Sequence, residues 1–492
     1  MAEQEVKAQG ASLGTMLTFG IGSMTVGIKN NLIGTFLLIY FNQVLGLPAI
    51  LAASAMAIAL FVDAISDPVV GIWSDRVRSR WGRRHPFIYA AIIPFALSYY
   101  FILQNPGSIS AGEITESELF NRLLMLMIIM RLSMTFYEVP RAALQPELTK
   151  DYDQRNQISG ISMAFGWIGG AGMASIAYAF FFVETPDFQG SRAFLRPEAF
   201  QTLAFWGGLS LFLSAVISNV GLHKHIPNLH VPEARSISIK KFFKEGLETV
   251  NNRSWIVLFF AGIVYSLLVG LGSNAGMYHN LYFWEWTPST IAIFPTVGFI
   301  CVVIVSMLAG TIARGRDKKK VAVGIFLTTI ITGPLPVILR LLDPHFEATL
   351  FPANGTDALW WIMITHYAFE VCLGSLGFIF IGSMTMEIVE DVEKTTGRRE
   401  EGLLGTVNTL VQKSVGAGGV FLSGVIISYV GFDAAGVTFE ELTGSVIDRF
   451  ATIHVILGAT LPFISTLLVL LYNIDRKGHL ENVENLGYIE EN

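Results

Sequence analysis

The chain has 492 residues, of which 52% are hydrophobic and only 15% are charged, and its mean hydropathy is +0.53. Because soluble domains carry about 25% charged residues, this composition excludes an ordinary water-soluble protein and indicates a chain covered largely by lipid. The net charge of −6 says little by itself, and the two cysteines imply no disulfide framework.

Twelve segments are long and apolar enough to cross a membrane, which takes about 20 mostly apolar residues. The acidic beginning of the chain, MAEQEVKAQG, does not resemble a secretory signal, so the first span is expected to be retained. We therefore predict an all-α polytopic membrane protein with twelve transmembrane helices. In chain order the predicted spans are 15–41, 49–73, 86–104, 120–145, 157–182, 200–221, 254–278, 287–312, 321–341, 357–388, 403–430 and 450–473.

Positive charge in the connecting segments is strongly one-sided. The runs from Arg76 to Arg84 and from Lys318 to Lys320 lie on the same predicted side as both termini, whereas the opposite loops hold few cations, such as Arg192 and Arg196. Because lysine and arginine are enriched in cytoplasmic loops, both termini are predicted to be cytoplasmic. We expect a multi-pass protein of the cell (inner) membrane.

The longest predicted cytoplasmic loop divides the chain into two halves of six helices. We assign 1–221 to the N-terminal half, 222–253 to the central loop, 254–474 to the C-terminal half and 475–492 to a cytoplasmic tail. A weak internal repeat supports this division, since GIWSDR follows the second span and GTIARGR ends the eighth. Paired halves are typical of the major facilitator fold, with a solute site at the midplane between them.

Ionisable residues inside predicted spans are the main functional signal. Each charge costs roughly 2.5–3.5 kcal/mol near the membrane centre, so such residues usually face a cavity or a partner. Four are acidic and four are basic, so the interior can be neutral overall. They are Lys29, Asp63, Asp67, Arg131, Glu138, Arg141, Glu370 and Lys413.

Asp63 and Asp67 are four residues apart, so on a helix their carboxylates share one face. Two carboxylates that close repel unless a sodium ion, a proton or a lysine lies between them. Lys413 is predicted to reach their level and to hold the two acids when no cation is bound. The alternatives are that the acids are satisfied by backbone or structural partners near Pro68, and that Lys413 reaches the inner headgroups.

Several further residues are candidates for contact with a solute. Glu138 either binds the solute or forms a structural ion pair with Arg141 or Arg131, and Lys29 either pairs with an acid or meets an anionic group. Aromatic rings can stack on a sugar, although most membrane aromatics serve packing or interfacial anchoring. The predicted solute-binding set is Glu138, Lys29, Tyr137, Arg141 and Trp167.

A basic loop joins the second and third predicted spans. Its sequence, SDRVRSRWGRRH, is too short and too close to the membrane to indicate nucleic-acid binding. We expect it to pair with helix ends and to latch an inner gate. The predicted gating residues are Asp75, Arg76, Arg83 and Arg84.

At these motifs the chain resembles the glycoside-pentoside-hexuronide:cation symporters, a branch of the major facilitator superfamily that includes melibiose permease. The resemblance covers nearly all of both halves. Its most specific pieces are DAISDP at 63–68, SDR with RSRWGRR at 74–84, YEVP at 137–140 with PELT at 146–149, and TGRREEG at 396–402 with VQK at 411–413.

The resemblance implies that Asp63 and Asp67 bind the coupling cation, sodium if the symporter uses sodium, with help from Lys413. It also implies that Glu138 matches an acid of the fourth helix that contacts sugar hydroxyls. One difference is that melibiose permease has a sugar-binding aspartate in its first helix, whereas here that helix has only Lys29. A galactoside is therefore doubtful, and an anionic or zwitterionic solute such as a uronide or a lysophospholipid stays open.

The sequence predicts a symporter that imports a small solute, such as a sugar or glycoside, with Na⁺ or H⁺ by alternating access. It is expected to need no cofactor beyond the coupling ion, to bind no nucleic acid and to act as a monomer in the bilayer. A membrane enzyme is disfavoured, because the chain lacks an HExxH pair, a nucleophile motif and a nucleotide loop. A non-transporting sensor is disfavoured by the short predicted tails.

Overall fold

The computed structural model describes residues 11–149, 152–226, 253–313, 316–347, 349–396, 401–433 and 444–473. Within these residues the regular elements are helices, and one isolated β-bridge joins Thr185 to Phe188. Twelve helical segments are long and apolar enough to cross a membrane, which confirms the predicted fold class. Residues 227–252 of the predicted central loop and the predicted tail, 475–492, lie outside the described residues.

The N-terminal half comprises the first six spans, which begin at Leu13 and end at His223. Polar caps fix several helix starts: the Ser12 hydroxyl accepts from Thr15 N (3.2 Å), and Thr115 and Glu118 form a capping box. The spans are α1 (Leu13–Asn31) continued by η1 (Leu32–Phe36), α2 (Leu37–Ile39) and η2 (Tyr40–Val44); α3 (Ala49–Arg76); α4 (His85–Ile102); α5 (Glu116–Leu144) with η3 (Gln145–Glu147); α6 (Tyr152–Ile176) with η4 (Ala177–Phe181); and, after η5 (Gly190–Leu195), α7 (Pro197–His223).

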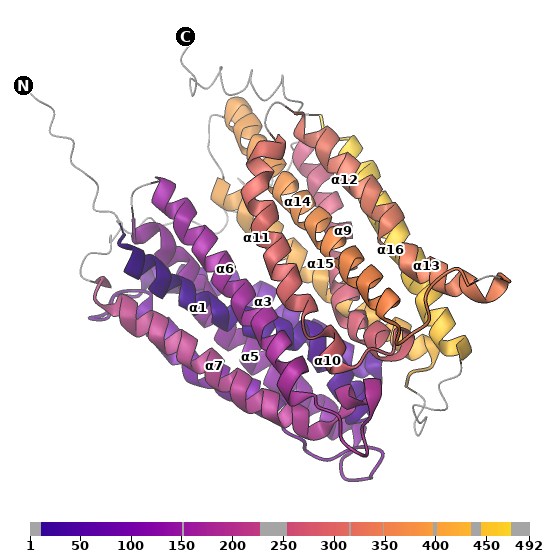
Figure 1. The fold of residues 1–492 in the computed structure, drawn as a ribbon. Helices are drawn as coiled ribbons and strands as arrows, with labels where there is room; N and C mark the ends of the chain where they lie inside the picture. The colour runs from indigo at the N-terminus through magenta and orange to yellow at the C-terminus, as the bar shows by residue number, and fades with distance from the viewer. Residues whose placement is uncertain are drawn as a thin grey trace, which may run out of the picture.

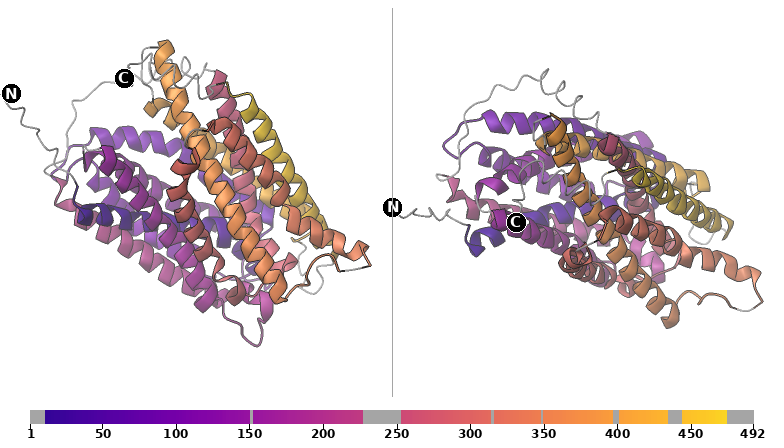
Figure 2. Two further views of the ribbon diagram at one scale, coloured as in Figure 1. Left: turned by 45° about the horizontal axis from the view of Figure 1, so that its top comes forward. Right: turned by 90° about the horizontal axis from the view of Figure 1, so that it is seen from above.

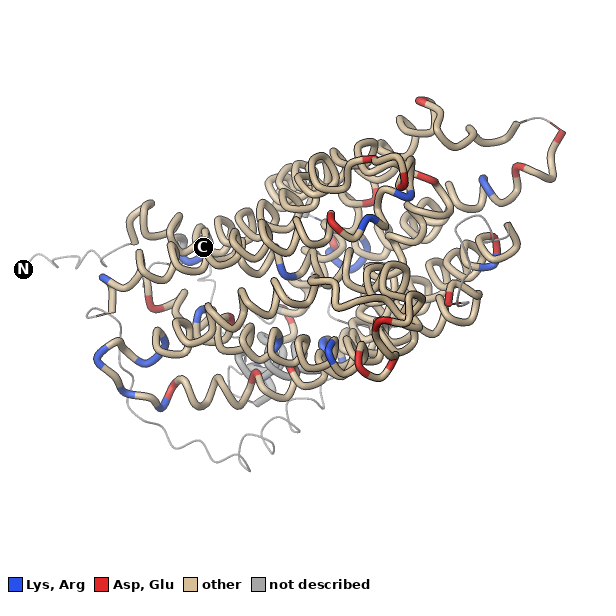
Figure 3. Tube along the Cα trace, turned by 90° about the horizontal axis from the view of Figure 1, so that it is seen from below, with Lys and Arg blue, Asp and Glu red and all other residues tan. Residues whose placement is uncertain are grey.

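The C-terminal half comprises the other six spans, from Arg253 to Leu470. Long stretches of these helices, and of those in the first half, carry no charged residue (Figure 3). The spans are α9 (Arg253–Tyr278) with η7 (His279–Phe283); α10 (Pro288–Ile291) and α11 (Phe294–Ala313); α12 (Lys318–Thr332) with α13 (Leu335–Leu342) and η8 (Asp343–His345); α14 (Asp357–Thr396); α15 (Glu401–Val430); and α16 (Gly444–Leu470).

Glycines bring the first and fifth spans of each half into close contact. A Cβ atom on Gly27 of α1 would lie 1.9 Å from the carbonyl oxygen of Gly166 of α6. In the second half, a Cβ atom on Gly270 of α9 would lie 2.7 Å from the carbonyl oxygen of Gly416 of α15. Small residues permit such approaches between membrane helices. The same device therefore occurs at equivalent places in the two halves.

The first span of each half also ends in the same way. A π-helical turn, η2 in one half and η7 in the other, is followed by a residue with positive φ. This residue is Gly46 (φ 83°) in the first half and Glu285 (φ 52°) in the second. The shared ending is a structural sign of the internal repeat that the sequence indicated elsewhere.

The two halves meet at one end and at mid-height, and they form two bundles in Figures 1 and 2. Among the described residues, every hydrogen bond between the halves involves residues 42–50, 63, 67, 175 or 178 of the first half. We call the end at which α3 begins and α15 finishes the closed end. If the termini are cytoplasmic, as the charge distribution predicts, the closed end faces outward.

Candidate cation and solute site

Two carboxylates of the first half and one ammonium group of the second half meet at mid-height. Asp63 and Asp67 lie one turn apart on α3, and Lys413 lies on α15. Lys413 Nζ donates to Asp63 Oδ2 at 3.0 Å and also to Asp67 Oδ2. The Asp63 side chain is fully buried, whereas those of Asp67 and Lys413 are 21% and 23% exposed. The structure thus brings together all three residues that the charge pattern grouped.

Helix α5 completes the surroundings of the two carboxylates. The Thr135 hydroxyl oxygen lies 2.9 Å from Asp63 Oδ1 and 3.1 Å from Asp67 Oδ1, and its single proton can serve only one of them at a time. Arg131 Nη1 lies 3.5 Å from Asp63 Oδ2. Pro68 lies inside α3 one residue beyond Asp67, and it cannot donate a backbone hydrogen bond. Sequence reasoning missed Thr135, because a hydroxyl in a helix gives no signal comparable to a charge.

This arrangement offers hard oxygen ligands to a small cation. Four carboxylate oxygens and one hydroxyl oxygen gather within a turn of α3 and the facing turn of α5. Such oxygens suit a hard cation, and a carboxylate can equally take a proton. In the structure the Lys413 ammonium supplies the positive charge between the two acids. A cation that binds both acids must therefore compete with Lys413.

Glu138 lies on α5, near the same level as this cluster. Its side chain is partly buried, and it forms no hydrogen bond or ion pair with any described residue. Within the described residues, Glu138 therefore forms no ion pair with Arg131 or Arg141, which was one of the alternatives that the sequence left open. Glu138 does interact electrostatically with Lys29 and Lys413, so its charge belongs to the same field as the cation site.

Lys29 is a fully buried cation on α1. Its ammonium group contacts the sulfur of Met134, and no carboxylate of the described residues lies within ion-pair distance. The charged residues that interact with it electrostatically include Glu138, Arg131 and Asp63 of the same half and Lys413 of the other. Lys29 is thus part of the charge cluster without a direct acidic partner.

The structure does not bring the other predicted solute contacts to the carboxylate cluster. The Tyr137 hydroxyl donates to Gly22 O at 3.0 Å, and the Arg141 guanidinium donates to Phe19 O and, at 3.1 Å, to Ser23 Oγ. Both side chains are buried between α5 and α1, where they join two helices of one half. Trp167 on α6 is 36% exposed and makes no ring contact with a described aromatic residue.

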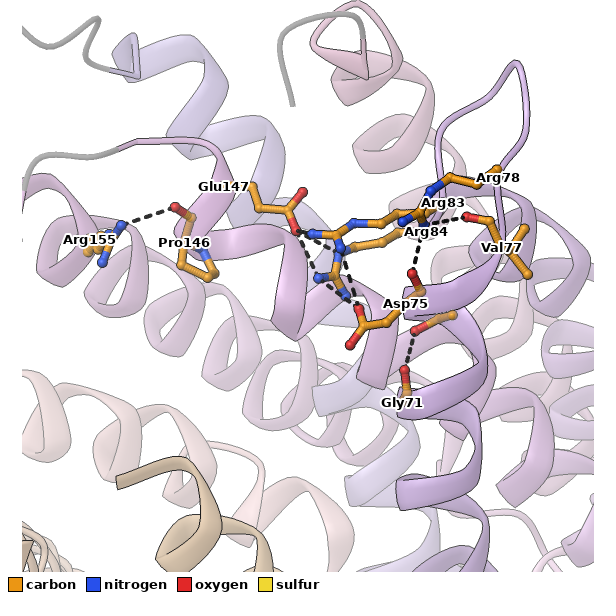
Figure 4. A network of polar contacts seen from close by, with 10 residues as sticks. Gly71, Asp75, Val77, Arg78, Arg83, Arg84, Pro146, Glu147 and Arg155 are labelled. Carbon is orange, nitrogen blue, oxygen red and sulfur yellow. Dashed lines mark hydrogen bonds and ion pairs between the residues drawn. The ribbon is translucent and has the colours of Figure 1, made fainter. Parts of the chain in front are cut away.

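Three of the four predicted gating residues, Asp75, Arg83 and Arg84, join a network within the first half (Figure 4). Arg83 and Arg84 both bind Glu147 of η3, at the end of the fourth span, with 2.8 Å between Arg84 Nη2 and Glu147 Oε1. Asp75, at the end of α3, lies 3.3 Å from Arg84 and 3.8 Å from Arg83. Arg76 is exposed and has no such contact with a described residue. Sequence reasoning did not single out Glu147, on which the network converges.

The second half carries a simpler version of this network. Lys318, at the start of α12, pairs at 2.8 Å with Glu387 of α14, which also accepts from the Tyr472 hydroxyl at 3.0 Å. The third and fourth spans of each half are therefore joined by a basic residue and a glutamate. Among the described residues, neither network reaches across to the other half.

A protein-family model described as "MFS/sugar transport protein" matches residues 18–476, nearly the whole chain. The chain belongs to this family. Membership of the MFS/sugar transport family makes it a multi-pass membrane transporter of the symporter type rather than an enzyme, as the glycoside:cation symporter resemblance predicted. The motif at 396–402 that contributed to that resemblance lies mostly outside the described residues.

Relatives within the MFS/sugar transport family differ in what they are named for. The inner membrane symporter YicJ of Escherichia coli is 25% identical over 91% of this chain and 89% of its own length. The isoprimeverose transporter of Lactiplantibacillus pentosus is 22% identical over 85% of this chain and 80% of its own length. A putative 2,3-dihydroxypropane-1-sulfonate exporter of Salmonella typhimurium is 24% identical over 85% of this chain and 84% of its own length. A local match, 35% identical, to an uncharacterized symporter of Synechocystis covers 37% of this chain and 34% of that one.

Solved structures agree on the fold. The xylose transporter XylE from E. coli, in a partially occluded inward-open conformation, superposes with a TM-score of 0.57. The two chains are 12% identical, and the match covers 94% of this chain and 98% of that one. At this identity the likeness concerns the major facilitator fold alone.

Proposed function

We propose that this protein imports a small sugar or glycoside with Na⁺ or H⁺ by alternating access, using Asp63 and Asp67 as the cation site. The observation that supports this proposal is the bond from Lys413 of the second half to both carboxylates of the first. A charge pair that joins the two halves at mid-height links occupancy of the cation site to the relative position of the halves.

The mechanism is a competition for two carboxylates. Without a cation, Lys413 pairs with both acids, so the empty carrier can reorient without leaving these two carboxylates unpaired. When Na⁺ or H⁺ binds, it displaces the ammonium group, and the halves are then held together only if a solute occupies the space between them. Glu138, which has no partner among the described residues, is available to accept hydrogen bonds from solute hydroxyls.

The test is transport by the purified full-length protein in liposomes. Uptake of labelled glycosides, uronides and lysolipids is followed with an inward Na⁺ gradient, with an inward H⁺ gradient and with neither. We expect at least one solute to accumulate above its external concentration under one of the gradients, and to equilibrate without it. Liposomes without protein provide the control. Equilibration without accumulation under both gradients would contradict cation coupling.

A second candidate is a symporter for an anionic solute, and the charge balance of the cluster favours it. The first half places three acids near Lys413, together with two cations of its own, Lys29 and Arg131, so this cluster is neutral before a coupling cation binds. Glu370, the fourth acid that the sequence places inside a span, lies in the second half, where it accepts a hydrogen bond from the Thr332 hydroxyl. Once a coupling cation has bound, a carboxylate or sulfonate on the solute would balance the excess positive charge.

This candidate is tested with solutes that differ only in charge. Uptake of a glucuronide is compared with uptake of the corresponding neutral glucoside, in the wild type and in Lys29→Met. We expect the wild type to favour the glucuronide and Lys29→Met to reverse or abolish that preference, because methionine keeps the length and removes the charge. A preference that survives in Lys29→Met would show that Lys29 does not select the solute.

A further inference from the structure

A second bridge between the halves lies at the closed end, on the same pair of helices as the cation site. Helix α15 ends at Val430, and Gly431 turns the chain with φ 107°, which places Asp433 beside the beginning of α3. Between Lys413 and Val430 the helix rises about 26 Å, at roughly 1.5 Å per residue. Helices α3 and α15 are therefore tied at two well-separated levels.

The bonds of Asp433 are those of a helix cap. Helix α3 begins at Ala49 after Pro48, which has no capping side chain. Asp433 Oδ1 accepts from Ala49 N at 2.8 Å, and the hydroxyl of Ser428, also on α15, accepts from Ile50 N at 3.1 Å. Free amide groups and the positive end of the helix dipole both favour a carboxylate at this position. The cap of a first-half helix is thus supplied by the second half.

Other polar groups extend this contact around Asn42 and Gln43, where the first span ends. Asn42 donates to Asp433 Oδ1 at 2.6 Å and accepts from the Tyr278 hydroxyl at 2.8 Å. Gln43 donates to Phe432 O at 3.2 Å and accepts from the Tyr282 hydroxyl. Among the described residues no lysine or arginine pairs with Asp433, so its charge is balanced by these donors and by the start of α3.

We propose that Asp433 is a positioning residue that caps α3 from the opposite half and thereby favours the state closed at this end. When the halves separate here, the first amide groups of α3 lose their acceptors, and Asp433 loses the donors of the first half and keeps only the Ser428 hydroxyl of its own half. Helix α3 also carries Asp63 and Asp67, so opening at this end uncaps the helix that holds the proposed cation site. This device acts on the closed state itself and does not depend on which solute is carried.

The experiment measures opening at this end by the reactivity of a single cysteine. Residues 49, 53 and 56 share one face of α3, and a Cβ on Gly424 of α15 would meet Ala53 and Ala49 there. Met56, 2% exposed, is therefore replaced by cysteine in a full-length chain whose own Cys301 and Cys372 are changed to serine. The purified protein is labelled in detergent with a water-soluble maleimide.

We expect labelling of Met56→Cys to become about fivefold faster with Asp433→Ala, the change that loss of one helix cap typically produces. Asp433→Asn should give an intermediate rate, because an amide oxygen still caps a helix without the charge. An unchanged rate in Asp433→Ala would overturn the proposal. If Asp433→Ala fails to fold, the test rests on Asp433→Asn. A labelling rate in Asp433→Asn equal to that of Met56→Cys alone would then overturn the proposal.

Two controls separate opening from general loosening. Asp448→Ala removes an exposed carboxylate from the same end of the molecule and should leave labelling unchanged. Leu203→Cys places the reporter in the core of the first half, on the fully buried face of α7, and its labelling should not respond to Asp433→Ala. Equal acceleration at both reporters, or by both aspartate changes, would show that Asp433 is not a specific cap.

Discussion

The two halves share one architecture but differ in how they use charge. Both bring their first and fifth spans together at glycines, and both join their third and fourth spans through a basic residue and a glutamate. Yet the first half holds five ionisable residues in the central cluster, whereas the second half contributes only Lys413 from its described residues. The repeat thus fixes the frame, and the binding chemistry is concentrated on one side of it.

This asymmetry suggests a division of roles. The first half can hold a cation and a solute, and the second half reaches it with one cation at mid-height and one anion at the closed end. Lys413 lies on α15 and Asp433 lies three residues beyond the end of that helix, and both contact α3. Under the two proposals above, this one helix pair would respond to cation occupancy at one level and to closure at the other. Substitutions in either half can test this division of roles.

The largest effect is expected from the acids of the first half. Asp63→Asn or Asp67→Asn should reduce gradient-driven accumulation about 100-fold, because an amide cannot balance a cation in a medium where an unbalanced charge costs roughly 3 kcal/mol. Solute exchange without a gradient should survive. The matched control is Glu370→Gln, which alters a carboxylate inside a span of the second half and should leave accumulation largely intact. Full accumulation in both aspartate variants would contradict the cation assignment.

The second prediction concerns the single cation that the second half contributes. Lys413→Ala should slow net uptake about tenfold, because the empty carrier must then reorient with Asp67 lacking its cationic partner and with Asp63 paired to Arg131 alone. Exchange omits the empty step and should stay within about threefold of the wild type, on the same reasoning. Lys413→Arg should rescue only partly, since a planar guanidinium fits a compact cation site poorly. Equal losses in net uptake and in exchange would contradict a specific role of Lys413 in reorientation of the empty carrier.

The third prediction separates solute from cation within the first half. Glu138→Gln should weaken solute binding about tenfold, because a hydrogen bond to a charged acceptor is worth roughly 1.5–3 kcal/mol and the amide keeps only part of it. Cation affinity should change by less, since Thr135 and the two aspartates remain. Isothermal titration with each ligand measures both affinities. Parallel losses would place Glu138 in the cation site instead.

The sequence predicted the fold and the central charge cluster because a charge in an apolar helix is costly and therefore conspicuous. Asp63, Asp67 and Lys413 were found in this way. Thr135 was not, because a helical hydroxyl can bond its own backbone and carries no such penalty. Asp433 was not, because it lies just beyond the predicted end of a span at residue 430, where an acid is ordinary. The partner of such a residue is known only when the other half is in place.

The direction in which a side chain leaves its helix was equally hidden, and Tyr137 is the clearest case. Residue type and depth put Tyr137 beside Glu138 as a solute contact, but adjacent residues on a helix point to different faces. In the structure Tyr137 is fully buried and its hydroxyl donates to the backbone of α1, while Glu138 has no partner among the described residues.

The smallest expected effect therefore comes from Tyr137→Phe. We expect solute and cation affinities to stay within about twofold of the wild type, and thermal unfolding in detergent to show a loss of about 1 kcal/mol, the usual net worth of one buried hydrogen bond. Deletion of the hydroxyl would remove only an additional donor to Gly22 O, which lies inside α1 and also accepts along that helix. A stability loss with intact affinity would mark Tyr137 as part of the frame that the two halves share. A loss of solute affinity as large as that of Glu138→Gln would instead place the α1–α5 contact in the solute site and widen the asymmetry between the halves.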